Sequence, residues 1–281
     1  MNENFHQFPD VTLLITHYNR SQSLEHLLET FRRQQCFFVE TVVSDDGSTA
    51  PHQEHLKHLQ SQYGFRLITT PQNRGLGHNL NKGQDAVRTP YTLYIQEDFE
   101  PEPAFAPNLA QALTFMQADR TIDIARFYAY TRYPHLTPYG GGFSEMRFSP
   151  WSTAYEKIYC YSDHPHLRRS TFFDRFGRYA EGIKGDKMEY KMCISFIQQR
   201  GRGLFFENYQ GLFRQINTAT EPSTMQRSAW TQSRQPVIAL IRDVYRQIKY
   251  NFDIQFKRVK IRSLAGKELT SSQPMIHNST P

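Results

Sequence analysis

The sequence predicts an α/β domain in which a mostly parallel sheet is flanked by helices. Over the first hundred residues, apolar β-rich runs alternate with stretches whose apolar residues repeat at helical spacing. Four such runs each end in polar or acidic residues, as expected where the carboxyl ends of parallel strands meet at one edge of a sheet. The 281 residues suffice to bury one full core.

The four strands are expected at residues 11–16, 38–44, 65–70 and 91–96. Leu24, Leu27, Leu28 and Phe31 mark a helix after the first strand. Further helices are expected around residues 56–63 and before residue 88. Right-handed crossovers should connect the parallel strands.

The patterns after residue 101 are less regular. We expect a helix at 105–116, a strand at 122–130, a helix at 168–176 and an amphipathic helix that ends near residue 200. Residues 133–151 combine prolines, among them Pro134 and Pro138, and three consecutive glycines with aromatic residues, which predicts a long loop. A binding loop or lid and a disordered segment both fit this composition.

The C-terminal region is expected to be a helical extension of the domain. A polar linker follows Asn217, apolar residues recur at helical spacing from Val237 to Ile248, and a disordered tail is expected from Lys267. Seven Lys and Arg residues lie between positions 242 and 262. This basic amphipathic helix fits packing on its own domain, contact with a partner subunit in a homodimer, or peripheral contact with an anionic membrane through residues 237–264.

Composition narrows the class of protein. The net charge of +6 and the pI near 9.2 favour an anionic partner, and the mean hydropathy of −0.64 comes without any apolar run of about 18 residues, so no membrane-spanning helix is expected. The first residues lack a secretory signal pattern, and three scattered cysteines indicate neither a disulfide framework nor a zinc cluster, so we expect a cytoplasmic protein. Nucleic-acid binding is not expected, because no motif accompanies the charge.

The end of the fourth predicted strand carries the first chemical signal. Glu97, Asp98 and Glu100 follow its apolar residues directly. Crowded carboxylates repel one another, and a hard divalent cation such as Mg²⁺ or Mn²⁺ relieves that repulsion. An ordinary acidic loop is the alternative.

Residues 73–83 form a glycine-rich turn that leads into a helix, a combination that favours an anion near the helix N-terminus. The string GLGHNL lacks the third glycine of a dinucleotide fingerprint and follows the third strand, so we do not expect a dinucleotide site.

Four segments resemble, in order and separation, the motifs of inverting family-two glycosyltransferases with the GT-A fold, a group that builds bacterial surface polysaccharides. They are VTLLITHYNRS, VVSDDGST, NRGLGHNLNKG and YIQEDFEP. The resemblance is clear over residues 11–101 and looser to 217. It implies a Rossmann-like GT-A domain at 1–225, with a nucleotide-sugar half at about 10–101 and an acceptor half at about 102–225. Residues 226–281 would form the linker, the basic helix and the tail.

The resemblance also implies roles for single residues. Thr16 and Tyr18 would line the nucleobase pocket, Asp45 would accept a hydrogen bond from the base, and Arg74 would lie near the diphosphate. Asp98 would bind the metal, while Gln96 stands where the family usually has another acid and Glu100 is a reserve carboxylate. The implied donor-binding residues are Thr16, Tyr18, Asn19, Asp45, Asp46, Arg74, Gly75, Asn79 and Glu97.

The catalytic base in this family is usually the aspartate of a Glu-Asp pair before a helix. Asp186 aligns best with it but follows Gly185 instead of glutamate, and Glu189 and Glu181 are the alternatives. Asp186 could equally cap the helix, and Glu189 could lie on its solvent face.

The expected reaction is a metal-assisted, inverting direct displacement in which one carboxylate is the general base. The donor would be a nucleoside diphosphate sugar, with a UDP-sugar as the first expectation, and the acceptor a glycan or a lipid-linked molecule. The alternative is a noncatalytic nucleotide or glycan binder with a degenerate GT-A fold, because Gln96 and Gly185 depart from the family pattern.

Overall fold

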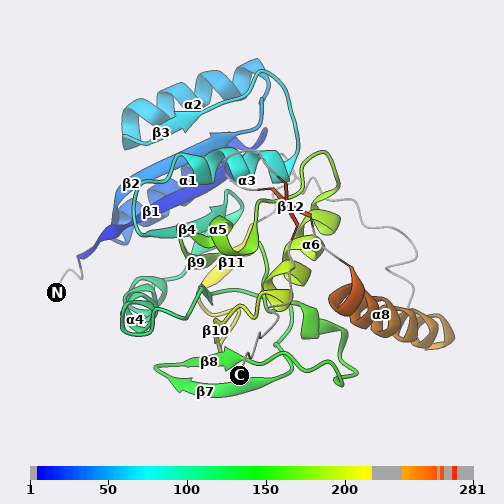
Figure 1. Cartoon of the computed structure of the whole chain (residues 1–281). Helices are drawn as coiled ribbons and strands as arrows, with labels where there is room; N and C mark the ends of the chain where they lie inside the picture. The colour runs from blue at the N-terminus through cyan, green and yellow to red at the C-terminus, as the bar shows by residue number, and fades with distance from the viewer. Residues whose placement is uncertain (1–4, 217–235, 258–259, 263–267, 271–281) are drawn as a thin grey trace, which may run out of the picture.

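A central sheet of nine strands, in the order β3-β2-β1-β4-β9-β6-β10-β8-β7, organises the described part of the chain (Figure 1). The structure is a computed structural model that describes residues 5–216, 236–257, 260–262 and 268–270. Helices cover both faces of the sheet, so the predicted α/β fold is confirmed.

The first half of the sheet is parallel, as predicted. It contains β1 (His6–His17), β2 (Cys36–Asp45), β3 (Arg66–Ile68) and β4 (Tyr91–Gln96). The helices α1 (Ser21–Arg33), α2 (Ala50–Tyr63) and α3 (Leu76–Asp85) connect these strands in turn. All four carboxyl ends therefore point to one edge.

Neighbouring side chains of β1 feed two cores on opposite faces of the sheet. Leu13 and Ile15 pack with α1, α2 and α4 (Phe105–Ala118), whereas Leu14 packs with α3, α5 (Phe172–Phe176) and α6 (Gly185–Gln198). A strand buried on both faces reads as a continuous apolar run, which is the pattern at residues 11–15.

The second half of the sheet is mixed. Strand β9 (His166–Arg169) lies antiparallel between β4 and β6 (Ile124–Arg126), and β10 (Gly203–Phe206) runs parallel to β6. The helix predicted at 168–176 is therefore wrong in its first part. Arg168 and Arg169 pair with strands on both sides, and only the buried phenylalanines of α5 keep the helical spacing.

A hairpin replaces most of the loop predicted at 133–151. Strands β7 (Leu136–Gly140) and β8 (Phe143–Met146) pair with each other, and β8 also pairs with β10. Gly141 and Gly142 make the turn at φ of 55° and 79°, a backbone region that suits glycine. The strand predicted at 122–130 is shorter, since only β6 joins the sheet.

A separate pair of short strands lies beside the end of β4. It consists of β5 (Phe99–Pro101) and β11 (Phe213–Gln215), which are antiparallel. This pairing brings residues 213–216 to the acidic segment, although more than one hundred residues separate them in sequence.

The C-terminal helix α8 (Pro236–Phe256) packs against α6 and the 3₁₀ helix η1 (Tyr155–Ile158) (Figure 1). The strands β12 (Lys260–Arg262) and β13 (Glu268–Thr270) pair, so residues 268–270 are ordered although we expected a disordered tail there. The predicted linker at 217–235 and the tail after residue 270 lie outside the described residues. Among the helices described, none has the length and hydropathy needed to span a bilayer.

Candidate functional site

The predicted polar edge is assembled by three neighbouring strands. Across β1, β2 and β4, the pairing places His17 opposite Asp45 and Thr16 opposite Gln96. Residues from three separate sequence segments thus lie side by side at the carboxyl ends of parallel strands, where open α/β sheets bind ligands.

Asp45 lies in a buried network at this edge. Its Oδ1 is 2.8 Å from His17 Nδ1 and accepts a hydrogen bond from Ser48 Oγ at 2.5 Å, while Oδ2 accepts one from the Ser48 N–H. Burial raises the pKa of Asp45, but the hydrogen bonds from His17 and Ser48 outweigh it, so the net pKa is lowered. Asp45 is therefore a carboxylate at neutral pH.

Asp46 holds the glycine-rich turn against the strand end. It accepts hydrogen bonds from the backbone N–H groups of Arg74 at 3.1 Å and Gly75 at 2.7 Å. The turn comes so close that a Cβ on Gly47 would lie 2.5 Å from the backbone of Gln72. The Arg74 side chain stays exposed, and its nearest acid is Glu181 at 3.4 Å.

Three other predicted donor residues hold the edge together through hydrogen bonds within the chain. Thr16 Oγ1 lies 3.0 Å from the Tyr94 hydroxyl, and the Asn79 amide donates to the His17 carbonyl. Asn19, at φ 54°, accepts a hydrogen bond from the N–H of Thr49 at the start of α2. Tyr18 remains partly exposed beside them.

Asp98 is buried at the end of β4 and has one oxygen to spare. Its Oδ2 lies 3.1 Å from Arg20 Nη1 and accepts a hydrogen bond from Gln215 Nε2 at 2.8 Å. Its Oδ1 is buried and has no hydrogen-bond partner in the described part of the chain. A buried carboxylate oxygen without a partner is costly, so it indicates a site for a further donor or a cation.

The chemistry of Asp98 fits a divalent metal that the protein holds through few ligands. Within the described residues, no group of three or more His, Cys, Asp or Glu side chains could hold an ion. Mg²⁺ is commonly bound through one or two carboxylates together with substrate phosphates, and a single oxygen such as Asp98 Oδ1 suits that mode.

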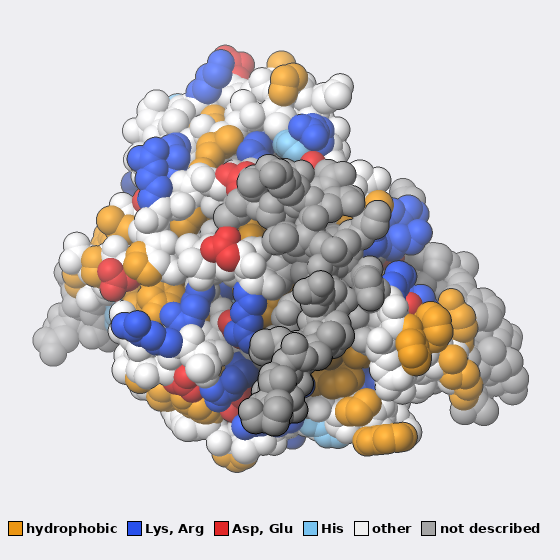
Figure 2. Space-filling view, viewed as in Figure 1, with side chains coloured by type: hydrophobic (Ala, Val, Ile, Leu, Met, Phe, Trp, Pro, Cys, Tyr) orange, Lys and Arg blue, Asp and Glu red, His pale blue; other side chains and the backbone are white. Residues whose placement is uncertain are grey.

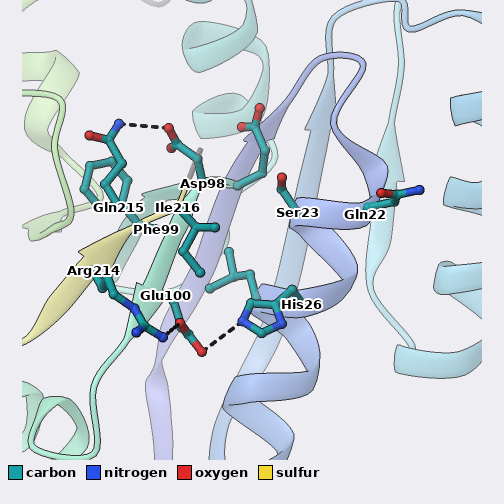
Figure 3. A pocket seen from close by; sticks show the side chains of 11 residues that line it. Gln22, Ser23, His26, Asp98, Phe99, Glu100, Arg214, Gln215 and Ile216 are labelled. Atoms are coloured by element: carbon teal, nitrogen blue, oxygen red, sulfur yellow. Dashed lines mark hydrogen bonds and ion pairs between the residues drawn. The ribbon is translucent and has the colours of Figure 1, made fainter. Parts of the chain in front are cut away.

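A cleft of about 650 Å³ opens beside Asp98, between the first turns of α1 and the β5–β11 pair (Figure 3). Glu97, Gln22 and Ser23 line it near Asp98, and Glu100 lines its other end. Glu100 contacts His26 at 2.9 Å and Arg214 at 2.5 Å. Burial raises the pKa of Glu100, but the hydrogen bonds from Arg214 and His26 outweigh it, so the net pKa is lowered.

A pair of carboxyl groups, Asp163 and Glu189, lies near the sheet edge between β9 and α6. Glu189 of α6 accepts hydrogen bonds from Ser162 Oγ at 2.7 Å and from the backbone N–H of Asp163 at 3.2 Å. Burial and the neighbouring Glu189 raise the pKa of Asp163 well above its usual range. For Glu189, burial raises the pKa but hydrogen bonding from Asp163 and the field of His164 outweigh it, so the net pKa is lowered. Burial and mutual repulsion therefore favour a proton on Asp163 over one on Glu189.

Asp186 and Glu181 differ from Glu189 in their surroundings. Asp186 is exposed in the first turn of α6, where its carboxylate accepts a hydrogen bond from the N–H of Lys187. Glu181 is exposed and contacts Asn81 and Arg74.

A chain of contacts links Asp98 to Glu189. The Gln215 amide that donates to Asp98 accepts a hydrogen bond from the Tyr130 hydroxyl at 2.8 Å. Tyr130 packs edge-on against His164, and His164 Nδ1 lies 3.0 Å from Ser162 Oγ, which donates to Glu189. Gln96 joins the same region because its amide donates to the Asp163 carbonyl. Side-chain contacts thus connect the two acidic centres.

The chain also matches known proteins. The family model for "Glycosyl transferase family 2" matches residues 12–177, which is more than half of the chain and includes every strand that forms the site edge. The chain belongs to glycosyl transferase family 2.

Two curated proteins resemble this family 2 chain. A teichoic acid poly(glycerol phosphate) polymerase of Staphylococcus epidermidis is 26% identical over 92 residues, which cover 32% of this chain and 13% of the polymerase. The protein EpsH of Bacillus subtilis (strain 168), designated a glycosyltransferase, is 22% identical over 231 residues, covering 73% of this chain and 67% of EpsH. The chain thus spans only a small part of the polymerase.

Solved structures show the same fold. S. aureus TarS 1-349, in complex with UDP-GlcNAc, superposes with a TM-score of 0.58 at 13% sequence identity. The match covers 87% of this chain and 72% of the TarS chain. The mannosyltransferase PcManGT from Pyrobaculum calidifontis, in complex with GDP-Man and Mn²⁺, has a TM-score of 0.50 at 15% identity. The match covers 72% of this chain and 55% of the PcManGT chain. The GT-A fold predicted for the family 2 chain is confirmed.

Several residues of the site were not foreseen from sequence. Arg20 and His17 stand inside the first motif, so their position next to a strand end was a usable signal. Asp163 and Gln215 lie in segments without a motif, and only the pairing of β9 and β11 with distant strands brings them in. The roles assigned to the donor residues, to Asp98 and to the base stay predictions.

Proposed function

We propose that the chain is an inverting glycosyltransferase that transfers a sugar from a nucleoside diphosphate donor to an acceptor hydroxyl. The observation that carries the proposal is Asp98, whose buried Oδ1 has no partner among the described residues and lies at the ligand-binding edge of a family 2 domain. Residues 10–101 would bind the donor and residues 102–225 the acceptor.

The donor would lie along the ends of β1, β2 and β4. Tyr18 is partly exposed there and offers a ring to the base, while the exposed Arg74 can approach the diphosphate from the turn that Asp46 fixes. Asp45 and Asn79 act mainly by shaping this edge, since their side chains bond within the chain.

Asp98 Oδ1 would hold Mn²⁺ or Mg²⁺, and such a cation, when bound, offsets the charge of the leaving diphosphate. Arg20 fixes the Asp98 carboxylate from the other oxygen, so that Oδ1 keeps its orientation. Gln215 supports the same orientation by donating to Oδ2.

Glu189 would be the general base. Its carboxylate is ionised, it is held by Ser162 and Asp163, and the contact chain through His164 connects it to Asp98. It would accept the proton from the acceptor hydroxyl as that oxygen attacks the anomeric carbon. A single displacement with one base inverts the anomeric configuration. Asp186 is the weaker candidate because its side chain is exposed at the helix start.

The donor proposed first is a UDP-sugar, since TarS was solved with UDP-GlcNAc. The acceptor proposed is a glycan or lipid-linked molecule of surface polysaccharide synthesis, in line with the relatives. The enzyme would then work in the cytoplasm, where nucleotide sugars are made. No nucleic-acid partner is proposed.

The test combines binding and turnover. Purified protein is heated with UDP-, GDP-, dTDP- or CMP-linked sugars, with and without Mn²⁺, and donor cleavage is followed in the same samples. One nucleotide class should raise the melting temperature in a metal-dependent way and be cleaved. Asp98→Asn should lose both effects, whereas Glu102→Gln, a change in a partly exposed neighbour, should keep them. Binding without cleavage, with acceptor glycans present, would favour the noncatalytic binder instead.

A further inference from the structure

Helix α8 has one side that is fixed to the domain. Tyr250 is buried, and Asp253 accepts a hydrogen bond from the Tyr190 hydroxyl at 2.7 Å. Asn251 accepts one from Lys157 Nζ at 3.1 Å, and Gln198 of α6 donates to the carbonyl of Ile254. These contacts set the rotation of the helix about its axis, so its opposite side must face outward.

The outward side is apolar. Val244, Tyr245, Ile248, Phe252 and Phe256 are between 51% and 68% exposed, and four of them repeat every fourth residue. Residues at this spacing form one stripe along a helix. Figure 2 shows hydrophobic side chains gathered over α8 at the right of the view. Such a contiguous exposed patch marks an interaction surface.

Trp151 adds a second exposed anchor next to this helix. It is 92% exposed, the largest exposure among the large hydrophobic residues described. Lys157 fastens its loop to α8, because the same ammonium group donates to the carbonyls of Pro150 and Ser152 and to Asn251. Gln247 of α8 also donates to the Thr153 carbonyl. The tryptophan and the helix are therefore positioned together.

The C-terminal part of α8 and the sequence after it carry an excess of positive charge. Lys249 and Lys257 both pair with Asp253, so two ammonium groups share one carboxylate, and the sequence continues with Arg258, Lys260 and Arg262. Aromatic and aliphatic side chains flanked by Lys and Arg suit the boundary between acyl chains and anionic headgroups. A twofold dimer through this stripe would place the basic flanks of two copies near each other.

We propose that the outward side of α8 and the adjacent Trp151 form a surface that binds an anionic lipid bilayer. The apolar stripe enters the interface between headgroups and acyl chains, and the basic residues contact lipid phosphates. This surface is separate from the site at the strand ends, and the proposal does not rest on glycosyl transfer.

The test is cosedimentation of the full chain with phosphatidylcholine vesicles that contain or lack phosphatidylglycerol. Binding should require phosphatidylglycerol and weaken as salt rises. The double variant Phe252→Gln/Phe256→Gln should bind at least about tenfold more weakly, because it removes two apolar side chains that would be buried in the interface. Val39→Gln removes an equally exposed apolar residue from β2 and should bind as the wild type does.

A second readout follows Trp151 itself. In the background Trp230→Phe, its emission should move to shorter wavelength on anionic vesicles and stay unchanged with phosphatidylcholine alone. Absence of vesicle binding by the wild type would overturn the proposal. A loss of vesicle binding in Val39→Gln as large as that in the double variant would also overturn it. A dimer that the double variant converts to monomer, without vesicle binding, would identify the stripe as a contact between copies and also overturn it.

Discussion

The two halves of the sheet are built in different ways. In β3-β2-β1-β4 all strands are parallel, and β1–β2 and β2–β3 each pair across a single connecting helix, while β4 returns to pair with β1. In β9-β6-β10-β8-β7 the partners come from distant segments, except in the β7–β8 hairpin, and β9 enters between β4 and β6 from forty residues further along. The first half places its polar edge mainly through local strand–helix units. The second half places Asp163, Glu189 and Gln215 through long-range pairing.

The difference separates two kinds of polar residue. In the first half, the buried polar side chains make hydrogen bonds that hold the strand ends and turns together, as Asp45, Asp46 and Asn79 do. In the second half, the pKa of Asp163 is raised and that of Glu189 is lowered, so two neighbouring carboxyl groups respond differently to their surroundings. Proton transfer should therefore depend on the second half and donor binding on the first.

Changing the proposed base should have the largest effect. Glu189→Gln is expected to lower the transfer rate by about 10²–10⁴-fold, because it removes the proposed general base while the carbonyl oxygen can still accept from Ser162. Single-turnover kinetics and the melting temperature should be measured together, with Asp186→Asn as the matched control at full rate. The reverse result, a dead Asp186→Asn and an active Glu189→Gln, would move the base to the helix start.

The next largest effect is on stability in the second half. Arg168 on β9 is fully buried, donates to Gln84 and the Tyr179 hydroxyl, and lies over four aromatic rings. Arg168→Ala should lower the free energy of unfolding by about 3 kcal/mol or more, since it leaves a cavity and unpaired polar groups.

Arg66→Ala is the control for that change in the first half. Arg66 on β3 is a third exposed and pairs with Glu40 at 2.8 Å. Its replacement should therefore lower the free energy of unfolding, measured by urea denaturation, by less than about 1 kcal/mol. Equal losses for the two arginines would contradict the contrast between the halves.

Close packing in the first half should give a smaller effect. A Cβ on Gly83 would lie 2.6 Å from Leu14 Cδ1 and 3.0 Å from Ser44 Cβ, so α3 would have to move away from the sheet. Gly83→Ala should lower the free energy of unfolding by about 1–3 kcal/mol. A Cβ on Gly185 would meet only Leu76 at 3.8 Å, so Gly185→Ala should leave thermal stability unchanged or slightly higher. Equal effects of the two changes would refute this packing argument.

The smallest expected effect is a pH dependence at Asp45. Its pKa is lowered in the fold, so its contribution to stability is complete above the unfolded value of about 3.9 and is lost as pH falls through the folded value. Asp45→Asn should lower the free energy of unfolding by about 1–2 kcal/mol at pH 7. In urea titrations, this difference between the wild type and the variant should shrink below about pH 4. A difference that stays constant down to pH 3 would mean that the ionised form contributes nothing.

The sequence by itself determined the parallel half and its polar edge. Strand runs such as 11–16 and the helical spacing of Leu24, Leu27 and Leu28 are local signals, because each strand–helix unit is contiguous. The acidic segment after β4 was also visible in the sequence, and the structure places its Asp98 at the sheet edge. Contiguous motifs can be recognised without knowledge of their partners.

Only the tertiary structure decided which residues lie together, which secondary structure they adopt and how their pKa values are shifted. Arg168 lies in a strand because two neighbours offer it backbone partners, whereas its local sequence suits a helix. The pKa of Asp163 is raised because burial beside Glu189 disfavours a second negative charge. Such long-range pairing and burial depend on residues far away in the chain, so no local pattern could specify them.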